Sequence, residues 1–146
     1  MLLDKKQLPL VAMEFMNDVH AEDIDIINQL FEQLLKYEQS QNSEDREKLI
    51  SLYKSWYEHT VEHFKGEEVM MEEKKFPPYP VHKGEHEYGL KRMDEVFNSW
   101  QETDDISILK VYLIEELPQW LIHHIKTMDT VTAMFFKTGL SPCSVD

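Results

Sequence analysis

Four long stretches of the chain place apolar residues at intervals of three and four, which is the period of an amphipathic α-helix. We expect helices over about residues 13–40, 44–75, 80–100 and 105–137, separated by polar or proline-rich breaks. Pro77 and Pro78 end the second stretch, and Pro80 suits the first turn of the third. The pattern predicts an all-α fold, an antiparallel up-down-up-down four-helix bundle.

The length of 146 residues fits one domain with a substantial core. Within that domain, residues 13–137 form the predicted bundle. Residues 1–12 are expected to be an irregular N-terminal arm because Pro9 opposes helix formation, and residues 138–146 are expected to be a tail.

Several residues mark the expected helix ends. Asn17 or Asp18 is a candidate cap for the first helix and Ser43 for the second. Pro118 lies inside the fourth stretch and is expected to kink or divide that helix. Gly139 and Pro142 are expected to close it.

The composition excludes several classes of partner. A net charge of −13 argues against nucleic acid and against an anionic membrane surface. The chain has no apolar run of transmembrane length and no evident signal peptide, so we expect no membrane insertion. The single cysteine, Cys143, has no partner for an internal disulfide and is read as an idle thiol, which favours a reducing, cytoplasmic location. The sequence identifies no protein partner.

On the apolar face of each of the four predicted helices, polar residues interrupt the apolar pattern. In an antiparallel bundle these interruptions would lie at the same height along the bundle axis. The first helix carries one near its start, the second two near its end, the third two at its start and the fourth two in its later half. These residues are His20, His63, Glu67, His82, His86, His124 and Asp129. His123 falls on the opposite, solvent-facing side of the fourth helix from His124.

The spacing of these residues favours metal binding over ordinary buried polar residues. A buried carboxylate such as Glu67 is costly without a partner, and a cation resolves that cost. His63 and Glu67 are four residues apart, as are His82 and His86, so each pair points to one side of its helix. His124 and Asp129 are five apart and splay by about 140° on an ideal α-helix. That geometry suits one terminal ligand and one carboxylate that reaches sideways between two ions.

The number of donors indicates two ions with one open position. Five histidines supply five bonds, two bridging carboxylates supply four, and a solvent-derived oxygen bridge supplies two, so two octahedral ions would keep one position free. Imidazole and carboxylate donors together suit iron. The set is less anionic than the helical di-iron pattern of four glutamates and two histidines. We therefore hypothesise that it favours reversible ligand binding over the formation of strong oxidants.

Three segments, HFKGEE, HKGEH and WLIHHIKTMD, closely resemble the signatures of hemerythrin, specifically of bacterial single-domain hemerythrins. A fourth segment, MNDVHAED, resembles the family's first-helix histidine segment more loosely. The resemblance spans about residues 13–137. It implies a four-helix bundle that holds a non-heme di-iron centre and binds dioxygen reversibly at one iron.

The resemblance also implies a role for each residue. His82, His86 and His124 would complete a six-coordinate iron, His20 and His63 would hold the iron with the open position, and Glu67 and Asp129 would bridge the two together with an oxo or hydroxo group. Bound dioxygen would be reduced to the peroxide level as both irons are oxidised. The apolar wall of the ligand pocket would include Phe64, Trp120, Leu121 and Ile125, with ordinary core packing as the alternative for each.

Two positions depart from the family pattern. Asn17 stands where members often have Asp, and His59 stands where many carry an aromatic residue. We expect His59 to be a satisfied or exposed histidine, with a hydrogen bond to the site or replacement of a ligand as alternatives.

The expected function is that of a dioxygen carrier, store or delivery protein rather than an enzyme. One alternative is a di-iron peroxidase or nitric-oxide-processing enzyme, with Glu22, Asp23 or His59 as proton donor. The other is an oxygen or redox sensor that acts through a separate partner.

Overall fold

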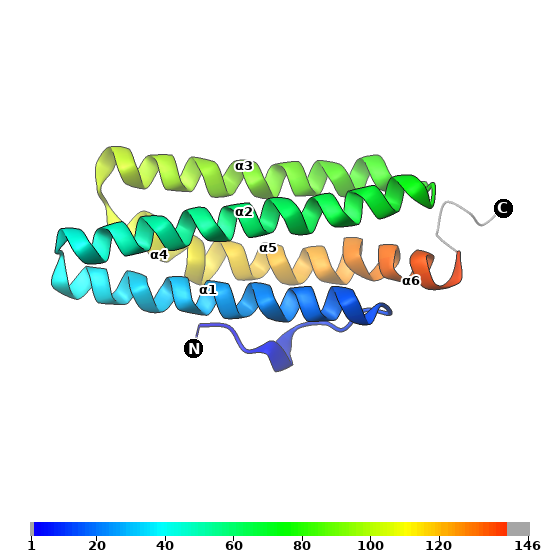
Figure 1. Cartoon of the computed structure of the whole chain (residues 1–146), viewed down its shortest axis with the longest axis horizontal. Helices are drawn as coiled ribbons and strands as arrows, with labels where there is room; N and C mark the ends of the chain where they lie inside the picture. Colours follow the sequence, from blue (N-terminus) through cyan, green and yellow to red (C-terminus); the bar gives the residue numbers. More distant parts are fainter. Residues whose placement is uncertain (1, 140–146) are drawn as a thin grey trace.

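The computed structural model of the chain, which describes residues 2–139, is a bundle of four long helical rods (Figure 1). Its α-helices are α1 (Glu14–Ser40), α2 (Ser43–Glu73), α3 (Tyr79–Thr103), α4 (Ile106–Val111), α5 (Leu117–His124) and α6 (Thr130–Thr138). The last three form the fourth rod, joined by two π turns, η2 (Tyr112–Glu116) and η3 (Ile125–Asp129). Residues 2–139 contain no strand, and the predicted antiparallel four-helix bundle is confirmed.

The start of α1 differs from the expected one. Asn17 and Asp18 lie inside the helix, so the expectation that one of them caps it is wrong. The Asn17 side chain instead accepts from the Val11 backbone N–H at 2.9 Å and donates to the Val11 carbonyl at 3.0 Å. The amide is used to hold the preceding arm, and α1 therefore begins at Glu14.

The cap of α2 is one residue earlier than expected. Asn42 Oδ1 accepts from the Asp45 backbone N–H at 2.8 Å, whereas Ser43 is the first residue of the helix. Gln41, which precedes this cap, has a φ of 51°, so the chain reverses sharply between α1 and α2.

The fourth rod continues through Pro118 without a break. A proline ring clashes with the carbonyl four residues before it in a regular α-helix, and it offers no N–H. The π turn η2 directly precedes this position, and the Leu117 N–H bonds to the Tyr112 carbonyl five residues back. The rod is therefore not interrupted at Pro118; instead, it changes from α-helix to π-helix just before the proline.

The N-terminal arm lies along α1 (Figure 1). It contains one short 3₁₀ turn, η1 (Lys5–Gln7). Asn28 on α1 holds the arm, because its amide accepts from the Leu3 N–H at 2.8 Å and donates to the Leu3 carbonyl at 2.9 Å. At the other end, Gly139 closes α6 with a φ of 76°, a left-handed value that favours glycine. Pro142 and Cys143 lie outside the described residues.

The core divides along the length of the bundle. The half that contains the α1–α2 and α3–α4 connections is packed with apolar side chains, among them Leu34, Tyr53, Trp100 and Leu113. The other half holds the buried histidines together with Asp23, Glu67 and Asp129, and beyond them Phe76 packs against Phe135 at 4.9 Å between ring centroids. The polar layer thus lies between two apolar ones.

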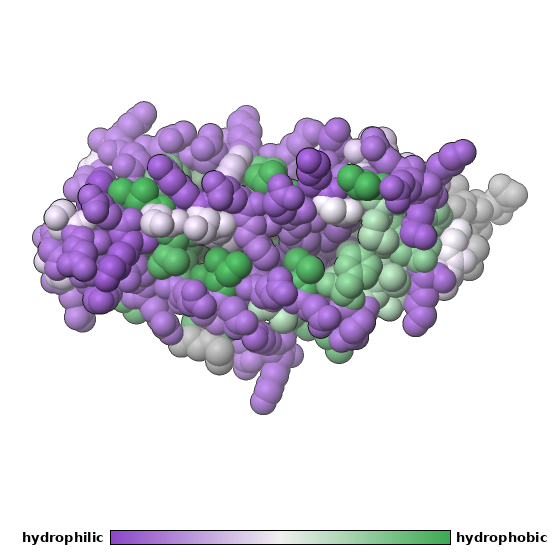
Figure 2. All heavy atoms as spheres, viewed as in Figure 1, coloured by the Kyte–Doolittle hydropathy of each residue, from purple (hydrophilic) through white to green (hydrophobic). Residues whose placement is uncertain are grey.

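The outer surface is mostly hydrophilic on the face drawn in Figure 2, with separate small hydrophobic patches. None of the helices within residues 2–139 combines the length and the apolar character that crossing a lipid bilayer requires.

Candidate metal centre

All seven predicted ligand residues meet in the polar layer, as two groups that share one residue. Within each group the donor atoms lie within 4.8 Å of one another. The larger group takes one residue from α2, two from α3, one from α5 and one from η3, whereas the smaller takes one from α1 and two from α2. The groups are Glu67, His82, His86, His124 and Asp129, and His20, His63 and Glu67.

Glu67 spans the two groups with its two oxygens. Its Oε2 lies 2.7 Å from Nε2 of His63 in the smaller group. Its Oε1 lies 3.3 Å from Nε2 of His86 and 3.5 Å from Nε2 of His82 in the larger group. A carboxylate that directs one oxygen at each group has the placement needed to bridge two ions.

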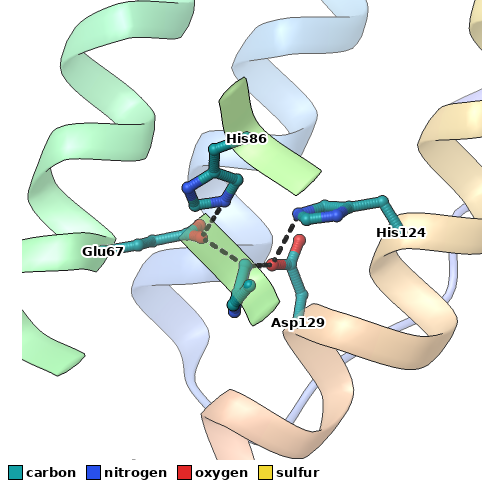
Figure 3. A group of neighbouring side chains, drawn as sticks. Glu67, His86, His124 and Asp129 are labelled. Atoms are coloured by element: carbon teal, nitrogen blue, oxygen red, sulfur yellow. Dashed lines mark ion pairs between the residues drawn. The ribbon is translucent and has the colours of Figure 1, made fainter. Parts of the chain in front are cut away.

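Asp129 spans the groups in the same way from the opposite side. Its Oδ2 lies 2.9 Å from Nε2 of His20, and its Oδ1 lies 3.1 Å from Nε2 of His82 and 3.2 Å from Nε2 of His124. Figure 3 shows Glu67 and Asp129 facing one another between His86 and His124. Each carboxylate therefore directs one oxygen at each set of histidines, although only Glu67 belongs to both groups.

The inward-facing atoms of the larger group have no hydrogen-bond partner among the described residues. Those buried atoms are Nε2 of His82, His86 and His124, Oε1 of Glu67 and Oδ1 of Asp129. These five atoms contact one another as ion pairs at 3.1 Å or more. Buried polar atoms are almost always hydrogen-bonded, so a convergent set that makes only such contacts is typical of a metal site. Neutral imidazole nitrogens and carboxylate oxygens are metal donors, and the residues present fit non-heme iron.

The outward-facing nitrogens of the larger group, in contrast, are all hydrogen-bonded. His82 Nδ1 pairs with Thr132 Oγ1 at 2.7 Å, His86 Nδ1 with Glu68 Oε2 at 2.9 Å, and His124 Nδ1 with Glu85 Oε1 at 2.8 Å. Such partners fix the ring orientation and the tautomer, and they leave Nε2 free to bind a metal.

The smaller group has a different outer partner. Asp23 Oδ2 lies 3.0 Å from His63 Nδ1, and Asp23 Oδ1 lies 2.9 Å from His59 Nε2. His59 is therefore paired with a carboxylate beside the site, and Nε2 of His63, not of His59, faces Glu67.

Sequence reasoning did not identify the outer partners Asp23, Glu68, Glu85 and Thr132 as such. Helical spacing carries a signal for three of them, because each follows a ligand candidate by three residues and so shares its helix face. These pairs are His20 with Asp23, His82 with Glu85, and Asp129 with Thr132. Glu68 follows Glu67 directly and has no such signal.

The π turn η3 brings His124 and Asp129 together. In this turn the Thr130 N–H bonds to the Ile125 carbonyl five residues back, and Thr130 Oγ1 donates to the same carbonyl at 2.7 Å. Bonding to the fifth residue places side chains five apart nearly above one another. The expected splay between His124 and Asp129 is therefore wrong, whereas the exposure of His123 is confirmed.

The pKa values of the buried groups show strong mutual charge stabilisation. Burial would raise the pKa of Asp129, but the charge of His124 and the close contacts of His124, His20 and His82 hold it well below its usual value. Burial would lower the pKa of His124, yet Asp129, Glu85 and Glu67 together outweigh that effect and raise the pKa to about 9. A metal ion bound to these donors would compete with protons, so its affinity would depend on pH.

Two aromatic rings lie flat against histidines of the larger group. Phe64 stacks on His86 with 3.9 Å between centroids and 1° between planes, and Trp120 stacks on His124 at 4.7 Å and 8°. A Cβ built on Gly89 would lie 2.9 Å from the Trp120 ring, so the absence of a side chain there lets the indole pack closely against α3.

A cavity of about 40 Å³ borders His20 and His63 of the smaller group, and also His124 and Asp129 of the larger group. Three of the four residues predicted for its wall, Phe64, Trp120 and Leu121, line it; Ile125 is fully buried but does not. The apolar lining also includes residues that sequence reasoning missed, one or more helical turns away from the ligands. These are Ile27, Trp56, Met93, Tyr112 and Leu117.

The chain resembles known proteins over nearly its whole length. The sequence profile described as Hemerythrin HHE cation binding domain matches residues 12–135. The chain is 34% identical over 133 residues to a bacteriohemerythrin of Aquifex aeolicus (strain VF5), covering 91% of this chain and 96% of that protein. It is 32% identical over 122 residues to a bacteriohemerythrin of Stenotrophomonas maltophilia (strain R551-3), covering 81% and 78%. No solved structure gives a significant match. With the buried histidine and carboxylate cluster at the positions that the family's motifs indicate, these matches show that the chain belongs to the hemerythrin family.

Proposed function

We propose that the chain binds dioxygen reversibly at one open position of a non-heme di-iron centre, as a carrier, store or delivery protein. His82, His86 and His124 would hold one iron and His20 and His63 the other, with Glu67, Asp129 and an oxo or hydroxo group as bridges. The asymmetric donor set supports this assignment, because three histidines face one position and two face the other.

The observation that carries the proposal is the placement of the cavity. It borders both histidines of the pair with fewer donors, His20 and His63, but only His124 of the three histidines in the larger group. At about 40 Å³ it exceeds the space that one water molecule needs. Two ferrous ions would supply the electrons that dioxygen binding requires. The chain's own contribution is to orient the donors and to exclude bulk water with the apolar side chains of the cavity wall, such as Phe64 and Leu121.

An anaerobic optical titration tests the proposal. Iron-loaded, fully reduced protein is titrated with oxygen, and the gas is then removed. We expect a coloured oxygenated form that disappears under vacuum and returns with oxygen. Irreversible oxidation without such a form contradicts the proposal.

One observation favours a di-iron peroxidase as the second candidate. Asp23 lines the cavity and pairs with the partly exposed His59, so an ionisable pair links the ligand pocket to the surface. Rapid consumption of hydrogen peroxide, with no reversible oxygenated form, supports this candidate instead.

The single-domain organisation and a cytoplasmic location belong to the same proposal. The family match over residues 12–135 supports the single domain, and the single cysteine supports the cytoplasmic location. The strongly negative net charge disfavours a nucleic-acid partner.

A further inference from the structure

The contact between α1 and α2 beside the smaller group is made by a buried carboxylate with a histidine on each side. The Asp23 side chain is 9% exposed, and its two oxygens lie 2.9 Å from His59 Nε2 and 3.0 Å from His63 Nδ1. The His59 side chain is 29% exposed, so it closes this arrangement at the surface.

The two proposed ion positions differ in the support of their histidines. Each histidine of the larger group has a hydrogen-bonded Nδ1. In the smaller group neither Nδ1 has a hydrogen-bond partner in the part of the chain that the structure describes, and only that of His63 has an ion-pair contact, with Asp23 at 3.0 Å. Asp23, beside His63, is therefore the outer carboxylate on which this position depends.

We propose that Asp23, held by His59, is the positioning residue for the iron next to His20 and His63 and so controls how tightly that ion is retained. This inference rests on the proposed function. A carboxylate at Nδ1 keeps the proton on that nitrogen, turns the lone pair of Nε2 inward and strengthens it as a donor. Loss of that carboxylate weakens the position that has fewer donors.

His59 is part of the arrangement because Asp23 has two oxygens to satisfy. His63 occupies only Oδ2, and a buried carboxylate oxygen without a partner is costly. His59 supplies that partner at Oδ1 from the neighbouring turn of α2, four residues before His63. His59 thereby holds the Asp23 carboxylate so that Oδ2 faces Nδ1 of His63.

Cobalt(II) titration of the metal-free protein tests the inference without relying on oxygen binding. Five-coordinate Co(II) absorbs visible light more strongly than six-coordinate Co(II), so absorbance separates the two positions. In Asp23→Asn we expect the strongly absorbing position to bind cobalt about 10- to 100-fold more weakly, the usual effect of losing an outer partner, while the other position keeps its affinity.

Matched variants complete the test. Glu85→Gln, at the outer partner of His124, should weaken the weakly absorbing position instead, and Glu62→Gln, at an exposed residue of α2, should change neither. His59→Phe should weaken the strongly absorbing position by a smaller factor than Asp23→Asn. His59→Gln, which retains an N–H donor, should lie closer to the parent.

The outcomes distinguish failure of the positioning role of Asp23 and His59 from failure of the proposed di-metal centre. If the parent binds two cobalt ions with one intense band but Asp23→Asn matches it, or weakens both positions equally, the positioning role is overturned while the di-metal centre stands. If His59→Phe matches the parent, the role of His59 is overturned. If the parent binds a single ion or shows no intense band, the proposed function itself is contradicted.

Discussion

Asp129 Oδ1 lies 3.2 Å from His124 Nε2, although the two residues are five apart in one helical rod. The π turn between them rotates Asp129 back to the face of His124, whereas residues five apart on a regular α-helix point about 140° apart. One segment thus provides both a terminal histidine and a carboxylate that reaches the opposite group through Oδ2.

The two adjacent histidines of α5 give a direct test of this geometry. His124 is buried among the ligand candidates and His123 is exposed. His124→Ala should lose iron together with about 3 kcal/mol of metal-dependent stability, the contribution of a ligand at roughly 100 times its Kd. His123→Ala should change neither quantity. Iron content and denaturant unfolding measure both effects, and equal losses from the two variants would refute the assigned helical phase.

Glu67→Gln tests the bridging carboxylate. The substitution keeps the size of the side chain but removes the charge that would hold two cations together, so we expect iron content to fall from about two to about one per chain. Glu62→Gln on the same helix, at an exposed residue, serves as control. A full complement of iron and an unchanged oxygenated spectrum in Glu67→Gln would argue against the bridge.

For each of the seven ligand candidates, the position along the bundle and the helix face could be predicted from the sequence. Each of these residues interrupts the apolar face of its helix. Helical period alone placed His63 with Glu67 and His82 with His86, and the structure brings these pairs together as expected. Because the four rods run antiparallel, residues from separate helices then lie at the same level along the bundle axis.

The π turns could not be predicted in the same way. They depend on packing along the whole fourth rod, and the local sequence around Ile125–Asp129 carries no breaker that marks one. Sequence analysis missed the α2 cap at Asn42 and the contact of Asn17 with the N-terminal arm. Near the start of each of these two helices, several polar residues could satisfy the same backbone groups. The extent of the cavity depends on side chains from all four rods, such as Ile27 and Leu117, which no single stripe identifies.

Gly89 should be intolerant of a side chain, because a Cβ there would lie 2.9 Å from the Trp120 ring. Gly89→Ala should displace the indole from His124 and destabilise the protein by about 1–3 kcal/mol, the usual range for overpacking. Gly84→Ala is the matched control on α3, since a Cβ there meets no described atom within 4 Å, and it should stabilise by about 0.5–1 kcal/mol. Denaturant unfolding and tryptophan fluorescence compare the two; similar behaviour would contradict the close packing of Trp120.

Leu121 lines the cavity one turn before His124 and should limit the access of water. Leu121→Ala should enlarge the cavity and speed autoxidation of the oxygenated form roughly tenfold, equivalent to a barrier lowered by about 1.4 kcal/mol. Ile114→Ala, at a 46% exposed residue of the same rod, should leave the rate unchanged. If optical decay is equally fast in parent and Leu121→Ala, Leu121 does not protect the pocket.

Elemental analysis of the iron-loaded protein, combined with Mössbauer spectroscopy of the same sample, tests whether five histidines and two bridging carboxylates hold a pair of iron ions. We expect about two irons per chain, with magnetically coupled ferric spectra after oxidation. A ratio near one, uncoupled iron, or tight retention of zinc alone would contradict this expectation.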